Sequence, residues 1–224
     1  MPPDPKLSSL AAALVPHGLI LRGGFFPTAA DRLQDAGTLV LIGNAGPAMW
    51  RRFEAYAYAD AAPHPLDRWT ERTVTPIAGA LGARALFPFG GPPHHPFQRW
   101  AQRAEPVHPS PLGLLIHPDY GLNHAYRAAL IFPERLAMPA PAHRPSPCAS
   151  CADRPCLAAC PVDAFSVERG YDVPACTAQI RSADGAECRG GGCLARRACP
   201  VGRAYAYDRE QSAFHMAAFE RARN

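Results

Sequence analysis

The sequence lacks an uninterrupted apolar run of about 18 residues, the length that a membrane-spanning helix requires. Residues 1–6 also lack the basic start and the long apolar stretch of a secretory or twin-arginine leader. Both absences predict a cytoplasmic protein that does not enter a membrane. Cysteine is missing from the first 147 residues, and all eight cysteines lie between Cys148 and Cys199. Because the cytoplasm is reducing, we do not expect disulfides among them.

A strong charge of either sign is also missing. The formal net charge is +4, which by itself is no evidence for a nucleic-acid partner. Lys6 is the only lysine, so nearly all positive charge is carried by arginine. The 26 prolines are spread along the chain, which predicts many rigid connections and few long helices.

Hydrophobic periodicity predicts helices and strands in alternation before the cysteines. We expect helices over residues 7–14, 47–60, 66–81 (broken by Pro76) and 97–105, and strands over residues 38–43, 84–89 and 112–117. For residues 122–132 the local pattern fits either a helix or a strand. Such alternation favours an α/β sandwich.

A proline-rich stretch at residues 139–147 reads as a stiff linker immediately before the first cysteine. We therefore predict an α/β domain over residues 1–140 and a cysteine-rich domain over residues 145–205. Residues 206–224 are expected to form an amphipathic helix that packs back on the first domain.

The cysteines form two groups, each of which ends in Cys-Pro. The first reads C-x2-C-x4-C-x3-C-P from Cys148, and the second is Cys176 followed by C-x4-C-x5-C-P from Cys188. Two-cluster ferredoxins use C-x2-C-x2-C-x3-C-P, and the fourth cysteine of each run binds the other cluster. By this pattern, one [4Fe–4S] cluster takes Cys148, Cys151, Cys156 and Cys199. The second cluster takes Cys160, Cys176, Cys188 and Cys193.

The spacing departs from the ferredoxin pattern in its second gap and at an inserted Arg189-Gly190-Gly191-Gly192. These glycines either let main-chain N–H groups approach a cluster or only fill a loop. The alternatives to iron–sulfur clusters are two zinc sites of four cysteines, disulfides, or free thiols. Zinc ribbons usually show C-x2-C twice, whereas this chain shows it once, which favours iron–sulfur.

Upstream of the cysteines, residues 112–121 read Leu-Gly-Leu-Leu-Ile-His-Pro-Asp-Tyr-Gly, followed by an apolar segment that ends at Phe132. This order resembles epoxyqueuosine reductases and cobalamin-dependent reductive dehalogenases over about residues 112–200. The resemblance implies an α+β chain, with a nitroreductase-like α/β sandwich followed by a small dicluster ferredoxin-like domain. It also implies that residues 122–132 form a strand and that a cobalamin lies beside one cluster. The implied cofactor contacts are Leu115, Ile116, His117, Tyr120, Gly121 and His124.

Together these features predict an iron–sulfur oxidoreductase that passes electrons through two clusters to a cofactor or substrate held by the N-terminal domain. An electron carrier without its own substrate and a redox-sensing regulator are the alternatives. We expect a flavodoxin- or ferredoxin-type redox partner, and tRNA remains open. The arginines near the last cysteines can dock an acidic donor or tRNA phosphates, or they can offset the clusters' negative charge: Arg181, Arg189, Arg196, Arg197 and Arg203.

Two further segments allow a functional and a structural interpretation. The aromatic, proline-rich residues 87–100 either cover a flat cofactor, with His94 or His95 as a polar contact or proton donor, or fill the core; the second is favoured. Residues 43–46, Gly-Asn-Ala-Gly, lack a complete phosphate-binding motif and indicate a turn. No catalytic residue is assigned from the sequence.

Overall fold

A computed structural model of the protein describes residues 4–59 and 62–223. The first residues of the N-terminal segment, position 60 of the expected second helix and position 224 lie outside these ranges. The chain divides into two compact units, and it passes between them more than once. The first unit contains residues 1–106 and 124–144, and the second contains residues 107–123 and 145–224. Within the described ranges, the structure has no helix that is both long and apolar enough to span a bilayer.

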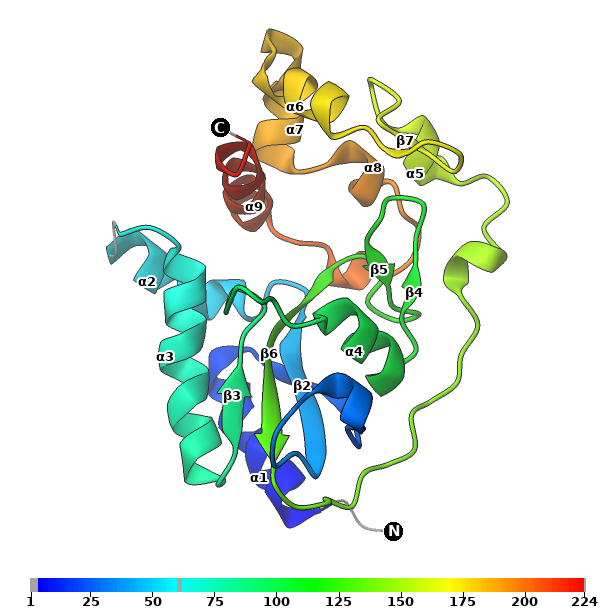
Figure 1. The fold of residues 1–224 in the computed structure, drawn as a ribbon. Coiled ribbons are helices and arrows are strands. Elements are labelled where there is room, and N and C mark those ends of the chain that lie inside the picture. The colour runs from blue at the N-terminus through cyan, green and yellow to red at the C-terminus, as the bar shows by residue number, and fades with distance from the viewer. Residues whose placement is uncertain (1–3, 60–61, 224) are drawn as a thin grey trace. The chain divides into compact units, whose positions relative to one another are not determined.

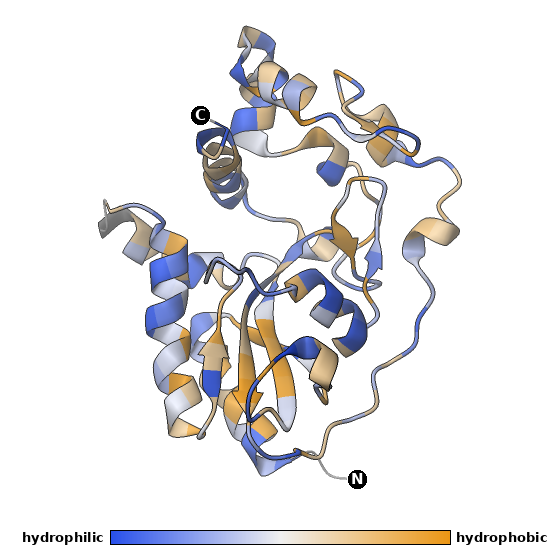
Figure 2. Cartoon of the chain, viewed as in Figure 1, coloured by the Kyte–Doolittle hydropathy of each residue, from blue (hydrophilic) through white to orange (hydrophobic). Residues whose placement is uncertain are grey.

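The first unit is built on a four-stranded sheet (Figure 1). Its strands, in spatial order, are β1 (Ile20–Phe25), β2 (Thr38–Ala45), β6 (His124–Phe132) and β3 (Arg84–Leu86). All three pairings are antiparallel, and the register of the central pair places Val40 opposite Leu130. Figure 2 shows that the central strands are strongly hydrophobic. The run from Leu39 to Ile42 is fully buried, as its unbroken apolar sequence predicts.

The helices of the first unit are α1 (Pro5–Leu14), α2 (Trp50–Ala59), α3 (Pro65–Ala80) and α4 (Phe97–Ala104), with short 3-10 turns at Val15–His17 and Ala29–Asp31. Helices α1, α3 and α4 pack against the sheet, and α2 packs against α3. The Asp4 side chain caps α1 by accepting from the main-chain N–H of Lys6 at 2.9 Å. The chain then leaves the helix at Gly18, whose φ of 65° favours glycine.

Three sequence expectations need correction. Helix α3 is not broken at Pro76 but runs through it, because Val74 and Ala78 beside it are buried and the helix packs on β3 and β6. Strand β3 ends at Leu86 instead of residue 89, where Pro88 cannot donate a ladder hydrogen bond. The strand expected over residues 112–117 is reduced to two residues, since Gly113 closes a turn with φ of 72°. By contrast, most of the ambiguous residues 122–132 do form a strand, β6, which begins at His124.

The second unit consists of short elements joined by turns (Figure 1). Its strands are β4 (His108–Pro109), β5 (Leu115–Ile116), β7 (Phe165–Ser166) and β8 (Gly170–Tyr171), paired as two small hairpins. Its helices are α5 (Pro155–Ala158), α6 (Val173–Arg181), α7 (Ala186–Gly191), α8 (Leu194–Arg197) and α9 (Arg209–Arg221), with 3-10 turns at Pro147–Ala149, Ala183–Gly185 and Arg203–Tyr205. The C-terminal helix α9 packs against α7 within this unit; its predicted packing on the first domain stays a prediction.

Candidate functional site

All eight cysteines lie in the second unit, and all are free thiols. Cys188 is buried, and the others are partly buried. Six of them pack against a core whose buried members come from both the upstream segment and the cysteine-rich region. The six are Cys148, Cys156, Cys160, Cys176, Cys193 and Cys199, and the core members are Leu112, Ile116, Leu122, Ala164, Phe165 and Ala195. Residues 112–122 therefore supply part of the apolar support beneath the cysteines.

Four of the cysteines lie close enough to influence one another's ionisation. Burial raises the pKa of the Cys148 thiol, and negative charge at Cys199, Cys156 and Cys151 raises it further. Burial also raises the pKa of Cys156, and negative charge at Cys199 and Cys151 raises it further. This set, which we call group I, joins the last cysteine of the chain to the first three.

The other four cysteines form a second set, group II. Burial raises the pKa of Cys188, and Cys176 and Cys160 add to this effect. The pKa of Cys193 is likewise raised, mainly by burial and then by Cys176 and Cys160. The four thiols line one cavity, and the rest of its wall is almost entirely apolar: Pro161, Val162, Phe165, Gln179, Ile180, Leu194, Ala195 and Met216.

Hydrogen-bond donors face the sulfur atoms of group II. The main-chain N–H of Ala164 donates to Cys160 Sγ at 3.3 Å. N–H groups at the start of α8 point at Cys193, and the Tyr171 hydroxyl points at Cys176; both interactions lower the pKa of the thiol against the effect of burial. Among the described residues, no three or more Cys, His, Asp or Glu side chains are arranged as the ligands of a single metal ion.

The inserted glycines pack against α9 and its ion pairs. A Cβ at Gly191 would lie 2.5 Å from Glu187 Oε1, and one at Gly192 would lie 2.9 Å from Ser212 Cβ. These glycines therefore let α7 approach the side chains around it. Arg189 is also structural, because its Nη1 donates to the main-chain carbonyls of Ile180 and Ser182, the latter at 2.8 Å.

Five of the six predicted cofactor contacts lie in the second unit, in β5 and the turn that follows it, and the sixth, His124, belongs to the first unit. Leu115 is half-buried, and Ile116 is fully buried in the core described above. Gly121 has a φ of 58°, and a Cβ there would lie 2.0 Å from the Val201 carbonyl oxygen. Ile116 and Gly121 thus serve the packing of this unit. The role of all six residues toward a cofactor stays a prediction.

His117 is buried and is held in one tautomer. Its Nδ1 accepts the main-chain N–H groups of Asp119 and Tyr120 at 3.0 and 3.3 Å. An imidazole nitrogen that accepts carries no proton, so the hydrogen of the neutral ring sits on Nε2. The ring also stacks on Tyr120, with centroids 4.2 Å apart. His117 therefore organises its own turn, with the ring hydrogen on Nε2.

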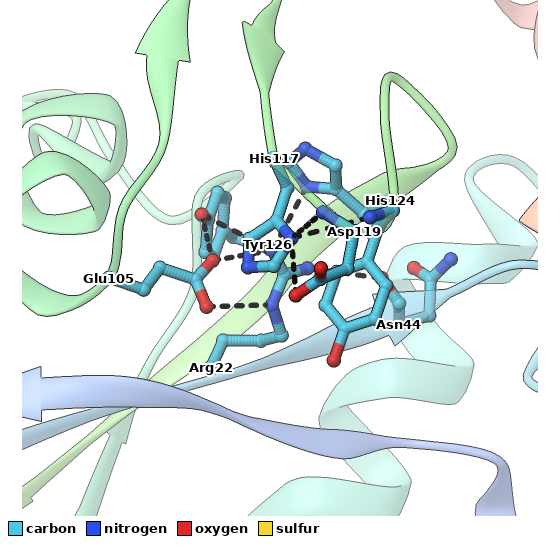
Figure 3. Close-up of polar contacts among 8 residues, drawn as sticks. Arg22, Asn44, Glu105, His117, Asp119, His124 and Tyr126 are labelled. Atoms are coloured by element: carbon cyan, nitrogen blue, oxygen red, sulfur yellow. Dashed lines mark hydrogen bonds and ion pairs between the residues drawn. The ribbon is translucent and has the colours of Figure 1, made fainter. Parts of the chain in front are cut away.

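His124 belongs to a buried polar network at the start of β6 (Figure 3). At its centre is Arg22 of β1, whose side chain is fully buried. The guanidinium pairs with the Glu105 carboxylate through Nη2 and Nε, the latter at 3.2 Å, and donates to the Asn44 carbonyl at 3.1 Å. Its Nη2 lies 3.1 Å from His124 Nδ1. Because arginine only donates, His124 Nδ1 accepts, and this ring too is neutral with its hydrogen on Nε2.

Tyr126 completes this network. Its hydroxyl donates to Glu105, and its ring lies 4.7 Å from the Arg22 guanidinium carbon. Burial raises the pKa of Tyr126, and the Glu105 carboxylate adds to the rise, so the phenol stays protonated at neutral pH. Sequence reasoning missed Arg22, Glu105 and Tyr126. The one local signal is an arginine inside the otherwise apolar and glycine-containing segment of residues 19–26.

The aromatic segment of residues 87–100 contributes to the core. Phe97 and Trp100 are buried, and His95 stacks on Trp100 with centroids 5.4 Å apart. Burial lowers the pKa of His95, and the charge of Arg84 lowers it further. Residues 43–46 continue β2 and then turn, and the Asn44 carbonyl is used by Arg22.

No protein-family model matches the chain, and no curated protein matches it in sequence. Solved structures do match in fold. An epoxyqueuosine reductase bound to a modified tRNA-Tyr stem loop aligns with a TM-score of 0.54 at 15% identity, over 91% of this chain and 66% of that one. An epoxyqueuosine reductase of Bacillus subtilis aligns with a TM-score of 0.51 at 16% identity, over 88% and 65%.

A C. elegans B12-trafficking protein, CblC, aligns with a TM-score of 0.53 at 14% identity, over 94% of this chain and 91% of that one. The chain shares the fold of these proteins. It is a mixed α+β fold, as the resemblance of residues 112–200 predicted. The chain spans 55–66% of the length of the matched reductases but nearly the whole of CblC.

Proposed function

We propose that the chain is an iron–sulfur oxidoreductase whose two [4Fe–4S] clusters pass electrons to a cofactor, cobalamin, or to a substrate held by the N-terminal unit. The observation that carries this proposal is the division of the eight cysteines into groups I and II. Each group combines cysteines from both runs, since Cys199 joins the first three cysteines and Cys160 joins Cys176, Cys188 and Cys193. In two-cluster ferredoxins the fourth cysteine of a run likewise crosses to the other cluster. The same division supports a ferredoxin-like character for the second unit.

The surroundings of the thiols suit such clusters. A cubane binds each thiolate to a different iron, so its four ligands surround the cluster instead of meeting at one atom. The apolar wall around group II excludes water, and the N–H donors stabilise thiolate sulfur. When bound, each cluster supplies one-electron transfer. The protein's own residues hold the sulfur atoms, exclude solvent and set the number of hydrogen bonds on which the reduction potential depends.

Cobalamin is the proposed acceptor because the fold is shared with a B12-trafficking protein over nearly the full length of both chains. We assign it the six contacts that the resemblance implies: Leu115, Ile116, His117, Tyr120, Gly121 and His124. A flavodoxin- or ferredoxin-type partner would supply the electrons. A tRNA substrate is the second candidate, favoured by the fold shared with a reductase solved with a tRNA stem loop.

The first test is metal analysis of anaerobically purified protein. We expect about eight irons and eight acid-labile sulfides per chain, and a broad visible absorption band that dithionite bleaches. A further spectral change on adding cobalamin would support the reductase, and its absence would favour the plain electron carrier. Loss of partner binding on oxidation, without turnover, would favour the redox sensor. Zinc without labile sulfide would overturn the proposal and leave a metal-stabilised interaction protein.

The cluster assignment is tested by paired substitutions. Cys199→Ser should perturb the same electron paramagnetic resonance signal as Cys148→Ser, although the two positions lie at opposite ends of the region. Cys160→Ser should perturb the signal that Cys176→Ser perturbs. If Cys160→Ser instead matches Cys148→Ser, each cluster is bound by one consecutive run of cysteines and the crossed assignment is wrong.

A further inference from the structure

A cavity of about 210 Å³ lies in the second unit beside both cysteine groups. We call it the arginine cavity. It is walled by α8, by α9 and by the chain on either side of them: Asn123, Gly191, Gly192, Cys193, Arg196, Arg197, Cys199, Arg203, Ala206, Tyr207, Ser212, His215 and Met216. A water molecule occupies about 30 Å³ in the liquid, so the cavity has room for a group of several heavy atoms.

The lining of the arginine cavity is strongly positive. It contains three guanidinium groups and, among the described residues, no carboxylate. Arg197 is neutralised by an exposed ion pair with Glu187, at 2.5 Å. Arg196 donates from Nε and Nη2 to the Leu122 carbonyl, at 3.0 and 2.6 Å, and lies 4.4 Å from the Tyr207 ring centroid. A carbonyl and a ring thus fix its position and leave its charge uncompensated.

Arg203 contributes a second uncompensated charge. It is exposed, and no acidic side chain of the described residues pairs with it. A hydroxyl at Ser212 and the carboxamide of Asn123 line the same cavity. Guanidinium, hydroxyl and amide groups are the donors that oxyanions bind in proteins.

One cysteine of each group stands in the wall of the cavity, Cys199 of group I and Cys193 of group II. The remaining six cysteines do not line it. The space is therefore not the one that either set of four sulfur atoms would enclose. Any charge placed in it would lie next to both sets at once.

We propose that the arginine cavity binds a small oxyanion, carried by a phosphate or a carboxylate group, and that its occupancy tunes the potentials of both clusters. The second part rests on the proposed function. An added negative charge beside the clusters disfavours their reduction, so the bound oxyanion lowers both midpoint potentials. The competing account is that Arg196 and Arg203 only offset the clusters' own negative charge.

The test uses anaerobically purified, iron-loaded protein with inorganic phosphate and acetate as probes. Isothermal titration should show saturable binding of at least one of them, and preference between the two identifies the group that the cavity takes. Arg203→Gln should weaken this binding by roughly tenfold or more, since a charge-assisted hydrogen bond is lost. Arg221→Gln removes the same charge from the exposed end of α9, outside the cavity, and should leave binding unchanged.

Midpoint potentials measured with and without the bound probe separate the two accounts. We expect the probe to lower the potentials of the wild type and of Arg221→Gln, and to have little effect on Arg203→Gln. If Arg203→Gln lowers the potentials but neither probe binds the wild type, the arginines only balance cluster charge and the inference is wrong. Because binding is measured by heat, it can be tested even if the protein proves to hold no iron, so failure of the proposed function is recognised separately.

Discussion

The buried Arg22 offers the sharpest test of the energetics of the first unit. Its side chain is fully buried and that of Glu105 is 11% exposed, so their ion pair is almost entirely removed from water. Glu105→Gln keeps the shape of the side chain but removes its charge. It also places an amide group, which carries donors, against a guanidinium that can only donate. One bond to the remaining carbonyl oxygen survives at best.

Removing one partner of a buried ion pair leaves an uncompensated charge and costs about 3–5 kcal/mol. Part of the hydrogen bonding survives in Glu105→Gln, and Arg22 keeps the Asn44 carbonyl, so we expect a loss of about 3 kcal/mol in the free energy of unfolding. Glu134→Gln is the matched control. It removes the same charge from the ion pair with Lys6, whose two side chains are 42% and 40% exposed, and solvent already screens that pair.

Tryptophan fluorescence during urea unfolding measures this loss in the right part of the molecule. All three tryptophans, Trp50, Trp69 and Trp100, lie in the first unit. The unfolding midpoint should fall clearly for Glu105→Gln and little for Glu134→Gln, with the slope against urea unchanged. If both variants show the same small loss in the free energy of unfolding, Arg22 is solvated in solution and the reasoning fails.

Two further predictions concern a glycine and a histidine. In thermal unfolding, Gly121→Ala should destabilise the second unit much more than Gly113→Ala. Both glycines have positive φ, but only at Gly121 would a Cβ collide with the main chain, at Val201. Equal losses of stability would contradict this close contact. For His95, burial and then Arg84 lower the pKa, so the unfolded state binds its proton more readily and stability falls as the pH drops below about 6.5. His95→Phe should lose less stability than the wild type between pH 7 and 5.5, and identical urea midpoint shifts would refute this.

Local sequence patterns predicted those helices and strands whose hydrophobic spacing is distinctive. The apolar run of β2 and the spaced apolar residues of α1 depend only on neighbours in the chain, so they can be recognised before folding. Strand β6 could not be assigned in this way, because its alanines and Leu130 are compatible with the spacing of both a helix and a strand. Its conformation is decided by pairing with β2 along the whole length of β6, which is a contact between distant segments of the chain.

The same distinction applies to the sites. The cysteine spacing is local and readable, and it produced a specific crossed assignment that now awaits measurement. The buried network is different, because Arg22 and Glu105 are 83 residues apart in the sequence and meet only through the sheet and α4. No sequence pattern around Arg22 or Glu105 predicts that the two residues pair. Long-range polar pairs of this kind become visible only when the fold has placed them.

The segment 107–123 has both a recognisable local sequence and contacts with distant residues. It precedes the first cysteine in the chain, yet it belongs to the unit that contains all eight. Gly121 lies against the Val201 carbonyl, and a Cβ at Gly202 would lie 2.2 Å from the Tyr120 carbonyl carbon, so both close approaches are made just after Cys199. The stretch that resembles the reductases is therefore part of the support for group I. The packing of this unit thus accounts for Gly121 and for the buried Ile116 before any cofactor is considered.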